Sequence, residues 1–150
     1  MTIQGSAVAI ERRFVEEEHR RLRSGLANLQ EAVSGPHLPT RAEAIDRVVK
    51  TLAWLRRDVL PHAAWEEAWL YSHVDIQAET AWATRALRIE HEQIRDCAAA
   101  LEAEFQAAEE HWTSEHACKL VVAIARLETL VAAHLVQEER IVLPMLDSAD

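Results

Sequence analysis

The sequence predicts an all-α protein, folded as an up-down-up-down antiparallel four-helix bundle with an internal two-fold repeat. Strong helix formers dominate it, with only 3 Gly and 4 Pro among 150 residues. Four amphipathic segments are separated by short breaks. Polar residues of the first half recur 72 positions later, as in two copies of one helical hairpin. The length suits a single domain spanning 1–150.

The first helix is expected over about residues 6–33. Val15, Leu22 and Leu29 recur at helical spacing and mark its inward face. Residues 34–39 contain a glycine and two prolines, so the helix is expected to stop there.

The second helix is expected over about residues 41–73. Thr40 is a candidate N-cap and Glu43 completes a capping box by position. Pro61 removes one backbone hydrogen bond, which predicts a bend or local opening one residue before His62. The predicted inward stripe comprises Ile45, Val48, Leu52, Leu55, Val59, Trp69 and Leu70.

The third helix is expected to begin near residue 75 or 80 and to end near residue 111. Thr113 or Ser114 can cap the fourth helix, and Pro144 is expected to end it. Short connections make neighbouring helices antiparallel. The first helix then corresponds to the third and the second to the fourth, as the repeat requires.

Histidines and glutamates carry the repeat. In each half, a histidine is followed 43 residues later by a second histidine that opens an HxxxEE cluster. Residues i and i+4 of a helix point within about 40° of each other, so the first glutamate of each cluster shares its histidine's inward face. Glu67 and Glu139 project about 140° away and are expected outside the ligand set. The six inward groups are His19, His62, Glu66, His91, His134 and Glu138.

Metal binding is the chemistry that explains these six groups best. A lone histidine on an apolar face is more often a satisfied core residue, and a bundle without metal is the alternative. Burying four imidazoles and two carboxylates together without a cation would cost on the order of several kcal/mol per ionised group. One histidine from every helix plus a matched glutamate pair therefore favours metal.

Counting ligands narrows the kind of site. If two ions are six-coordinate, twelve positions must be filled. Four imidazoles, two bridging carboxylates and a bridging oxo or hydroxo group leave two positions open to solvent, dioxygen, peroxide or nitric oxide. Such mixed ligation suits iron, with manganese or zinc as contenders.

Other features exclude some classes of function. A net charge of -9 without a basic stripe argues against nucleic acid as a partner. The N-terminal stretch lacks the apolar core of a signal peptide, and no uncharged stretch approaches the ~20 residues that span a bilayer. A cytoplasmic protein without a membrane partner is expected, with Cys97 and Cys118 as reduced, structural thiols.

These residues resemble the hemerythrin-like, or HHE cation-binding, domain family over essentially the whole chain. The resemblance rests on a histidine in each helix and on the segments LPHAAWEE, EHEQI and HLVQEERIVLP. It implies a non-haem di-iron centre in which His19 and His62 serve one iron and His91 and His134 the other. Glu66 and Glu138 would bridge the two ions.

The sequence departs from the oxygen-carrying members. Those carry a second histidine four residues after the third-helix ligand, where this chain has Arg95, and Arg23 occupies the symmetric position. Arginine is permanently protonated and does not ligate metal. The resemblance therefore implies iron, peroxide or nitric oxide chemistry, including catalase-like detoxification, rather than oxygen carriage. A sensing module and an iron storage or repair protein remain alternatives, and a homodimer or protein partner stays open.

Four neighbours of the ligand set have roles to be tested, and for three of them two interpretations stay open. Trp65 and Trp69 could shield the metal, although core packing is the simpler reading. Asp58 could accept the second N–H of His62, or it could be an ordinary exposed acid. Tyr71 is expected to point away from His62 and is therefore a poor redox partner.

Overall fold

The computed structural model describes the backbone of residues 3–31 and 38–147, with the side chains of all of these except 3–11, 31, 83 and 147. Most of the expected break at residues 34–39 lies outside the described residues. The described chain is helical almost throughout and contains no strand in these ranges.

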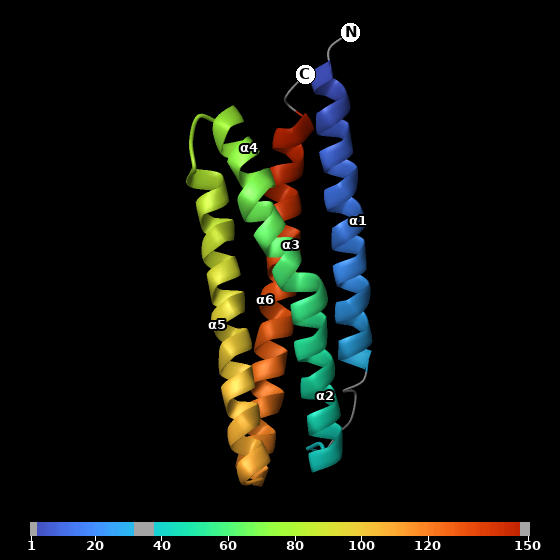
Figure 1. The fold of residues 1–150 in the computed structure, drawn as a ribbon, viewed down its shortest axis with the longest axis vertical. Helices are drawn as coiled ribbons and strands as arrows, with labels where there is room; N and C mark the ends of the chain where they lie inside the picture. The colour runs from blue at the N-terminus through green and yellow to red at the C-terminus, as the bar shows by residue number, and fades with distance from the viewer. Residues whose placement is uncertain (1–2, 32–37, 148–150) are drawn as a thin grey trace.

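Four helical rods form the bundle (Figure 1). The first is α1 (Ile3–Glu31), the third α5 (Trp82–Glu110) and the fourth α6 (Ser114–Asp147). The second rod is continuous but changes its winding, through α2 (Arg41–Trp54), η1 (Leu55–Val59), α3 (Leu60–Trp65), η2 (Glu66–Leu70) and α4 (Tyr71–Gln77).

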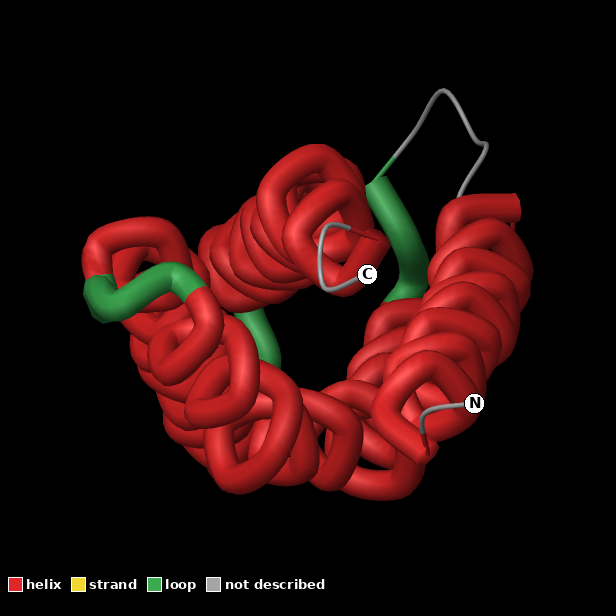
Figure 2. The backbone as a smooth tube through the Cα atoms, turned by 90° about the horizontal axis from the view of Figure 1, so that it is seen from above, coloured by secondary structure: helices red, strands yellow, loops and turns green. Residues whose placement is uncertain are grey.

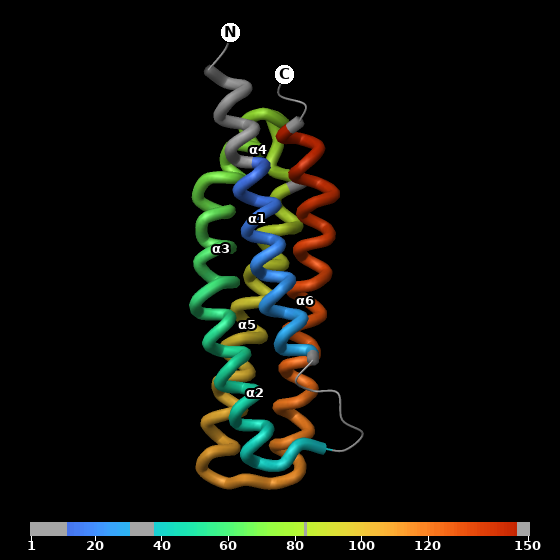
Figure 3. Tube along the Cα trace, turned by 90° about the vertical axis from the view of Figure 1, so that its right-hand side faces the viewer, coloured from blue at the N-terminus to red at the C-terminus, as the bar shows by residue number. Residues whose placement is uncertain are grey.

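Consecutive rods run antiparallel, so the beginning of α1 and the end of α6 lie at the same end of the bundle (Figure 3). Viewed along its length, the bundle places the rods around a common centre (Figure 2). The predicted all-α, up-down-up-down architecture is confirmed.

Local capping chemistry explains where two of the rods begin. The Thr40 hydroxyl accepts a hydrogen bond from the backbone N–H of Glu43, whose carboxylate accepts one from the backbone N–H of Thr40. This is the predicted capping box. Thr113 caps α6, because its hydroxyl accepts from the backbone N–H of His116 at 3.2 Å.

The second rod contains two π-helical turns, η1 and η2. The N–H of Leu60 bonds the carbonyl of Leu55, and that of Tyr71 bonds the carbonyl of Glu66, each five residues back. The first turn lies just before Pro61, and this is the predicted local opening. Figure 1 shows the rod changing direction where α2 meets α3.

A π turn holds one residue more than an α turn, so the residues after it face a different side. The expected inward position of Trp69 is therefore wrong, because its side chain is 71% exposed. Tyr71, expected to point away from the site, is fully buried. The unbroken 3.6-residue period assumed for the second rod places both aromatic rings incorrectly.

The end of α6 also differs from the expectation. Pro144 lies inside the helix, which continues to Asp147. Leu146 follows the proline and is 1% exposed, packed in an apolar cluster with Val15 and Leu70. Burial of this last turn against the core holds the chain in helical form past the proline.

The apolar core is divided into two clusters. One fills the half of the bundle around Leu26, Leu52 and Leu127, and the other lies nearer the chain ends around Val15 and Val74. A band of buried polar residues separates the clusters. Along α1, for example, His19 lies between Val15 of one cluster and Leu22 of the other.

Within the described residues, α6 is the one helix whose length and apolar composition would allow it to cross a membrane. Its buried side packs against the rest of the bundle, with Leu120, Leu127 and Leu135 each at most 1% exposed. A core helix of a bundle is expected to have this composition.

Candidate metal centre

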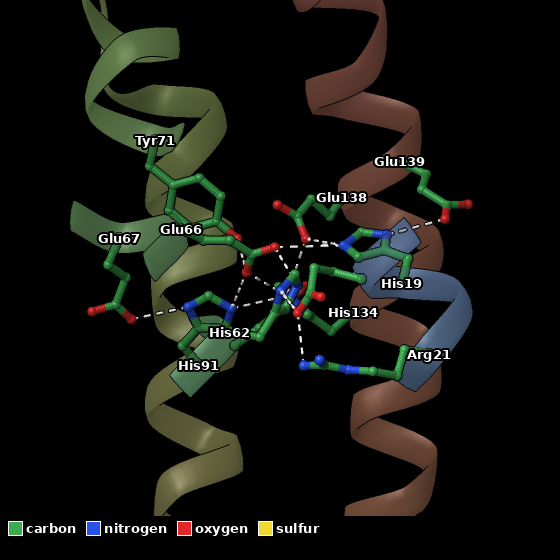
Figure 4. A network of polar contacts seen from close by, with 12 residues as sticks. His19, Arg21, His62, Glu66, Glu67, Tyr71, His91, His134, Glu138 and Glu139 are labelled. Carbon is green, nitrogen blue, oxygen red and sulfur yellow. Dashed lines mark hydrogen bonds and ion pairs between the residues drawn. The ribbon is translucent and has the colours of Figure 1, made fainter. Parts of the chain in front are cut away.

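The six sequence-predicted ligands meet in the polar band between the two apolar clusters. None of their residues is more than 5% exposed, and His19, Glu66 and Glu138 are fully buried. They come from all four rods and point toward one another (Figure 4). Each rod brings its polar groups to the same height because apolar core residues flank them on both sides.

The six side chains form two overlapping groups whose ligand atoms lie within 4.8 Å of one another. One group holds His19 and His62 with both glutamates, and the other holds His91 and His134 with Glu66. Glu66 is therefore common to both groups.

The two oxygens of Glu66 face opposite pairs of histidines. Oε1 lies 2.5 Å from Nε2 of His62 and 3.5 Å from Nε2 of His19. Oε2 lies 3.2 Å from Nε2 of His91 and 3.9 Å from Nε2 of His134. A carboxylate with this orientation can bridge two cations.

Glu138 also faces both halves of the centre. Its Oε2 lies 3.2 Å from Nε2 of His19 and 3.5 Å from Nε2 of His134. The two histidines belong to different groups, so Glu138 occupies a second position between them.

Several buried atoms of the centre have close polar neighbours but no well-aligned hydrogen bond among the described residues. These atoms are both ring nitrogens of His62 and both carboxylate oxygens of Glu138. Native proteins rarely leave such groups unpaired. A cation would satisfy Nε2 of His62 and the Glu138 carboxylate, so the residues present fit a metal.

The pKa values of these groups reflect the same need for positive charge. Burial alone would raise the pKa of Glu66, but hydrogen bonds with the four histidines bring it well below its usual value. Burial and the neighbouring Glu66 carboxylate raise the pKa of Glu138. Burial would lower the pKa of His19, yet hydrogen bonds to Glu138 and Glu66 raise it to about 10. The raised pKa values of His19 and His134 favour protonated imidazoles there, which supply positive charge of the kind that a metal would bring.

A second set of carboxylates surrounds the histidines. Each histidine turns Nδ1 toward a glutamate on the neighbouring rod: Glu139 for His19 at 3.1 Å, Glu67 for His91 at 2.9 Å, Glu90 for His134 at 2.8 Å and Glu18 for His62 at 3.9 Å. The four contacts follow one direction around the bundle, from the rod that carries the glutamate to the rod that carries the histidine: from α6 to α1, from α1 to the second rod, from the second rod to α5, and from α5 to α6. We call these four glutamates the outer ring.

Two members of the outer ring are held by surface arginines. Arg23 donates to Glu139 at 2.6 Å, and Arg95 donates to Glu67 at 3.0 Å. These arginines lie four residues after His19 and His91, and Arg95 stands at the position of the extra histidine of the oxygen carriers. They act on the centre through the glutamate that orients a ligand imidazole, an arrangement common around metal-bound histidines.

The outer ring was not predicted from the sequence, although the sequence repeat contains a signal for it. Glu18 and Glu90 are 72 residues apart, as are Glu67 and Glu139. The repeat therefore contains these four glutamates together with the ligands. Distinguishing them from ordinary surface acids requires the rotation of each helix, which periodicity gives only approximately.

The suggested role of Asp58 is wrong. Its carboxylate accepts hydrogen bonds from Arg57, at 2.7 Å for the shortest, and the nearest outer carboxylate to His62 is Glu18. Tyr71, set aside in the sequence, reaches the centre. Its hydroxyl donates to Oε2 of Glu66 at 3.5 Å, and its ring stacks on His91.

The two cysteines are free thiols, as expected. Cys97 is partly buried against the larger apolar cluster and Cys118 is exposed. Neither belongs to the groups that could hold a metal.

Comparison with protein families gives an independent result. The family model described as the hemerythrin HHE cation binding domain matches residues 12–146, which cover most of the chain and all six candidate ligands. Searches of curated proteins and of solved structures found no match.

Proposed function

This chain belongs to the hemerythrin HHE cation-binding domain family, and from that premise we propose that it is a non-haem di-iron protein. We propose further that it takes a small oxidant ligand, namely dioxygen, peroxide or nitric oxide, at this centre.

The observation that carries the proposal is the orientation of Glu66. Its two oxygens face two separate histidine pairs, at 2.5 Å from His62 on one side and 3.2 Å from His91 on the other. A single ion would need one set of converging donors. Two sets that share a carboxylate support two ions.

The donor types support iron. Imidazole and carboxylate nitrogen and oxygen donors without a thiolate suit iron, whereas a closed structural zinc site usually contains cysteine. Six side chains also leave open positions on a pair of six-coordinate ions. Iron, when bound, would supply the redox-active centre at which a small ligand coordinates.

The chain's own residues hold and shield such a centre. The outer ring orients the imidazoles of His19, His91 and His134, and apolar clusters on both sides keep bulk water away. Tyr71 places a hydroxyl beside Glu66, where it can donate a hydrogen bond within the buried band. Arg95 bonds Glu67 and offers no extra imidazole, which supports a role other than oxygen carriage.

The test is elemental analysis of protein purified without added metal, followed by absorption spectra before and after exposure to dioxygen, peroxide and nitric oxide. We expect about two irons per chain and new charge-transfer absorption on oxidation. A matched pair of variants, His134→Ala in the centre and His111→Ala on the surface, should lose and keep the metal respectively. Zero or one iron per chain, or two ions of manganese or zinc, would contradict the di-iron assignment.

The same samples address the competing function of a sensor. A sensing module would bind iron without turning over peroxide or nitric oxide, and would change its association state with metal content. Size measurement of the metal-loaded and metal-free forms, beside an assay of peroxide consumption, separates the two functions.

A further inference from the structure

The outer ring is symmetric except at one histidine. Glu90 accepts a hydrogen bond from His134 at 2.8 Å, but its repeat equivalent Glu18 remains 3.9 Å from Nδ1 of His62. That nitrogen is buried without a hydrogen-bond partner among the described residues. The two halves of the centre are therefore supported unequally.

Arg21 explains the difference, because it lies on α1 with Glu18 and holds that carboxylate along its own helix. Arg23 and Arg95 instead lie on the rods of His19 and His91, so they draw Glu139 and Glu67 toward those histidines. The Arg21 guanidinium donates to Oε2 of Glu18 at 2.8 Å, and Oε2 is also the atom nearest His62. Asp58 lies 3.9 Å from Nε of Arg21 on the other side and is 7% exposed. Figure 4 shows the Arg21 side chain extending from α1 below the ligand cluster.

The second repeat lacks this competition. Seventy-two residues after Arg21 stands Gln93, and after Asp58 stands Leu130. Gln93 is exposed and uncharged, so it brings no positive charge to Glu90. Two differences between the repeats, Gln93 in place of Arg21 and Leu130 in place of Asp58, thus accompany the different positions of the two equivalent carboxylates.

The carboxylate behind a ligand histidine affects metal affinity. It fixes which ring nitrogen carries the proton, holds the ring in the ligating orientation and makes the imidazole more basic. Loss of such a partner typically reduces metal affinity about 10–100-fold. His134 has this support and His62 does not.

We infer that the two metal positions have different affinities: the His91–His134 position binds its ion tightly, and the His19–His62 position binds a second ion weakly and exchanges it. Arg21 is the positioning residue that sets this difference by holding Glu18. The protein would then change between one-ion and two-ion forms as metal supply changes. The inference rests on the proposed two-metal function.

The test is a reciprocal exchange between the repeats. Metal-free protein is titrated with Co²⁺ in competition with a chelator, and two dissociation constants are fitted. Arg21→Gln should tighten the weaker constant about 10-fold and leave the tighter one unchanged, because Glu18 becomes free to approach His62. Gln93→Arg should weaken the tighter constant, because the new guanidinium competes for Glu90.

Arg20→Gln is the matched control, since it removes the same charge from an exposed neighbour. Equal tightening by Arg20→Gln and Arg21→Gln would show a general charge effect and overturn the inference. Two equal dissociation constants in the natural protein would also overturn it, while leaving the two-metal proposal intact. Failure to bind Co²⁺ at all, or binding of a single ion at saturation, would instead contradict the proposed function.

Discussion

The hydroxyl of Tyr71 lies 3.5 Å from Oε2 of Glu66, five residues earlier in the chain. In an α-helix the residue one turn after Glu66 on the same face would be Leu70, because i and i+4 share a face. The π turn over Glu66–Leu70 inserts one residue and brings Tyr71 there instead. A change of winding, invisible in composition, thereby adds a polar group to the centre.

Substitutions of the two aromatic residues test this winding directly. Trp69→Ala should change the free energy of unfolding by less than about 0.5 kcal/mol, because the ring is exposed. Tyr71→Ala should cost about 3–5 kcal/mol, because it empties a fully buried ring position. Urea unfolding of the metal-free variants measures both. An unbroken α-helix would reverse the order of the two losses.

The two bridging candidates should differ in their effect on metal content. Glu66→Ala should remove both ions, because Glu66 belongs to both ligand groups. Glu138→Ala should leave about one ion, held by Glu66, His91 and His134. Metal per chain after gel filtration is the measurement, with the exposed Glu109→Ala as the control. Equal loss in the two bridging variants would contradict the unequal roles.

Stability of the metal-free protein should fall at alkaline pH. The pKa of His19 rises from an ordinary 6.5 to about 10, as hydrogen bonds to Glu138 and Glu66 outweigh burial. Such a group stabilises the fold fully below pH 6.5, and this contribution is lost as pH rises through 10. Urea unfolding at pH 6.5, 8 and 10 measures the decline. His19→Gln should show a shallower decline, and a parallel one would rule out His19 as the cause.

Metal binding has a matching proton signature. Because ligand imidazoles must be neutral, loading metal at pH 7 should displace the proton held by His19. Calorimetric titration with Zn²⁺ in buffers of different ionisation enthalpy counts the released protons. We expect release of about one proton or more per chain, and apparent affinity that rises with pH. No buffer dependence would mean that His19 is already neutral.

Gly25→Ala should destabilise the bundle although alanine is the better helix former. An added Cβ would lie 2.3 Å from Nε1 of Trp54, whose residue is only 3% exposed. The gain in helix propensity is about 1 kcal/mol, whereas overpacking costs about 1–3 kcal/mol. Urea unfolding should therefore show a net loss, which disappears in a Trp54→Leu background. A more stable Gly25→Ala protein would show that the two helices separate easily.

The sequence was sufficient for the bundle and for bringing six side chains together. Helical periodicity placed His19 and Glu138 on buried faces, and the 72-residue repeat identified equivalent groups in the two halves. Pro61 marked the first π turn. No comparable residue marks the second, and Tyr71 was therefore placed on the wrong side.

The partners of the histidines were harder to predict for a different reason. Asp58 lies one turn before His62 on the same helix, so spacing favours it, but the observed neighbour is Glu18 from α1. Contacts between helices depend on how each rod is rotated about its axis. Arginines also compete for the same carboxylates, and this competition emerges only when all four rods are assembled.

The outer ring makes the two halves of the chain depend on each other. His19 in the first hairpin relies on Glu139 in the second, and His91 in the second relies on Glu67 in the first. A fragment that ended after α4 would lack the carboxylate for His19 and half of the ligands. If Glu67 and Glu139 are not interchangeable, two separately produced hairpins should associate with each other rather than with copies of themselves. These contacts between the hairpins make the complete and oriented ligand set a property of the whole chain.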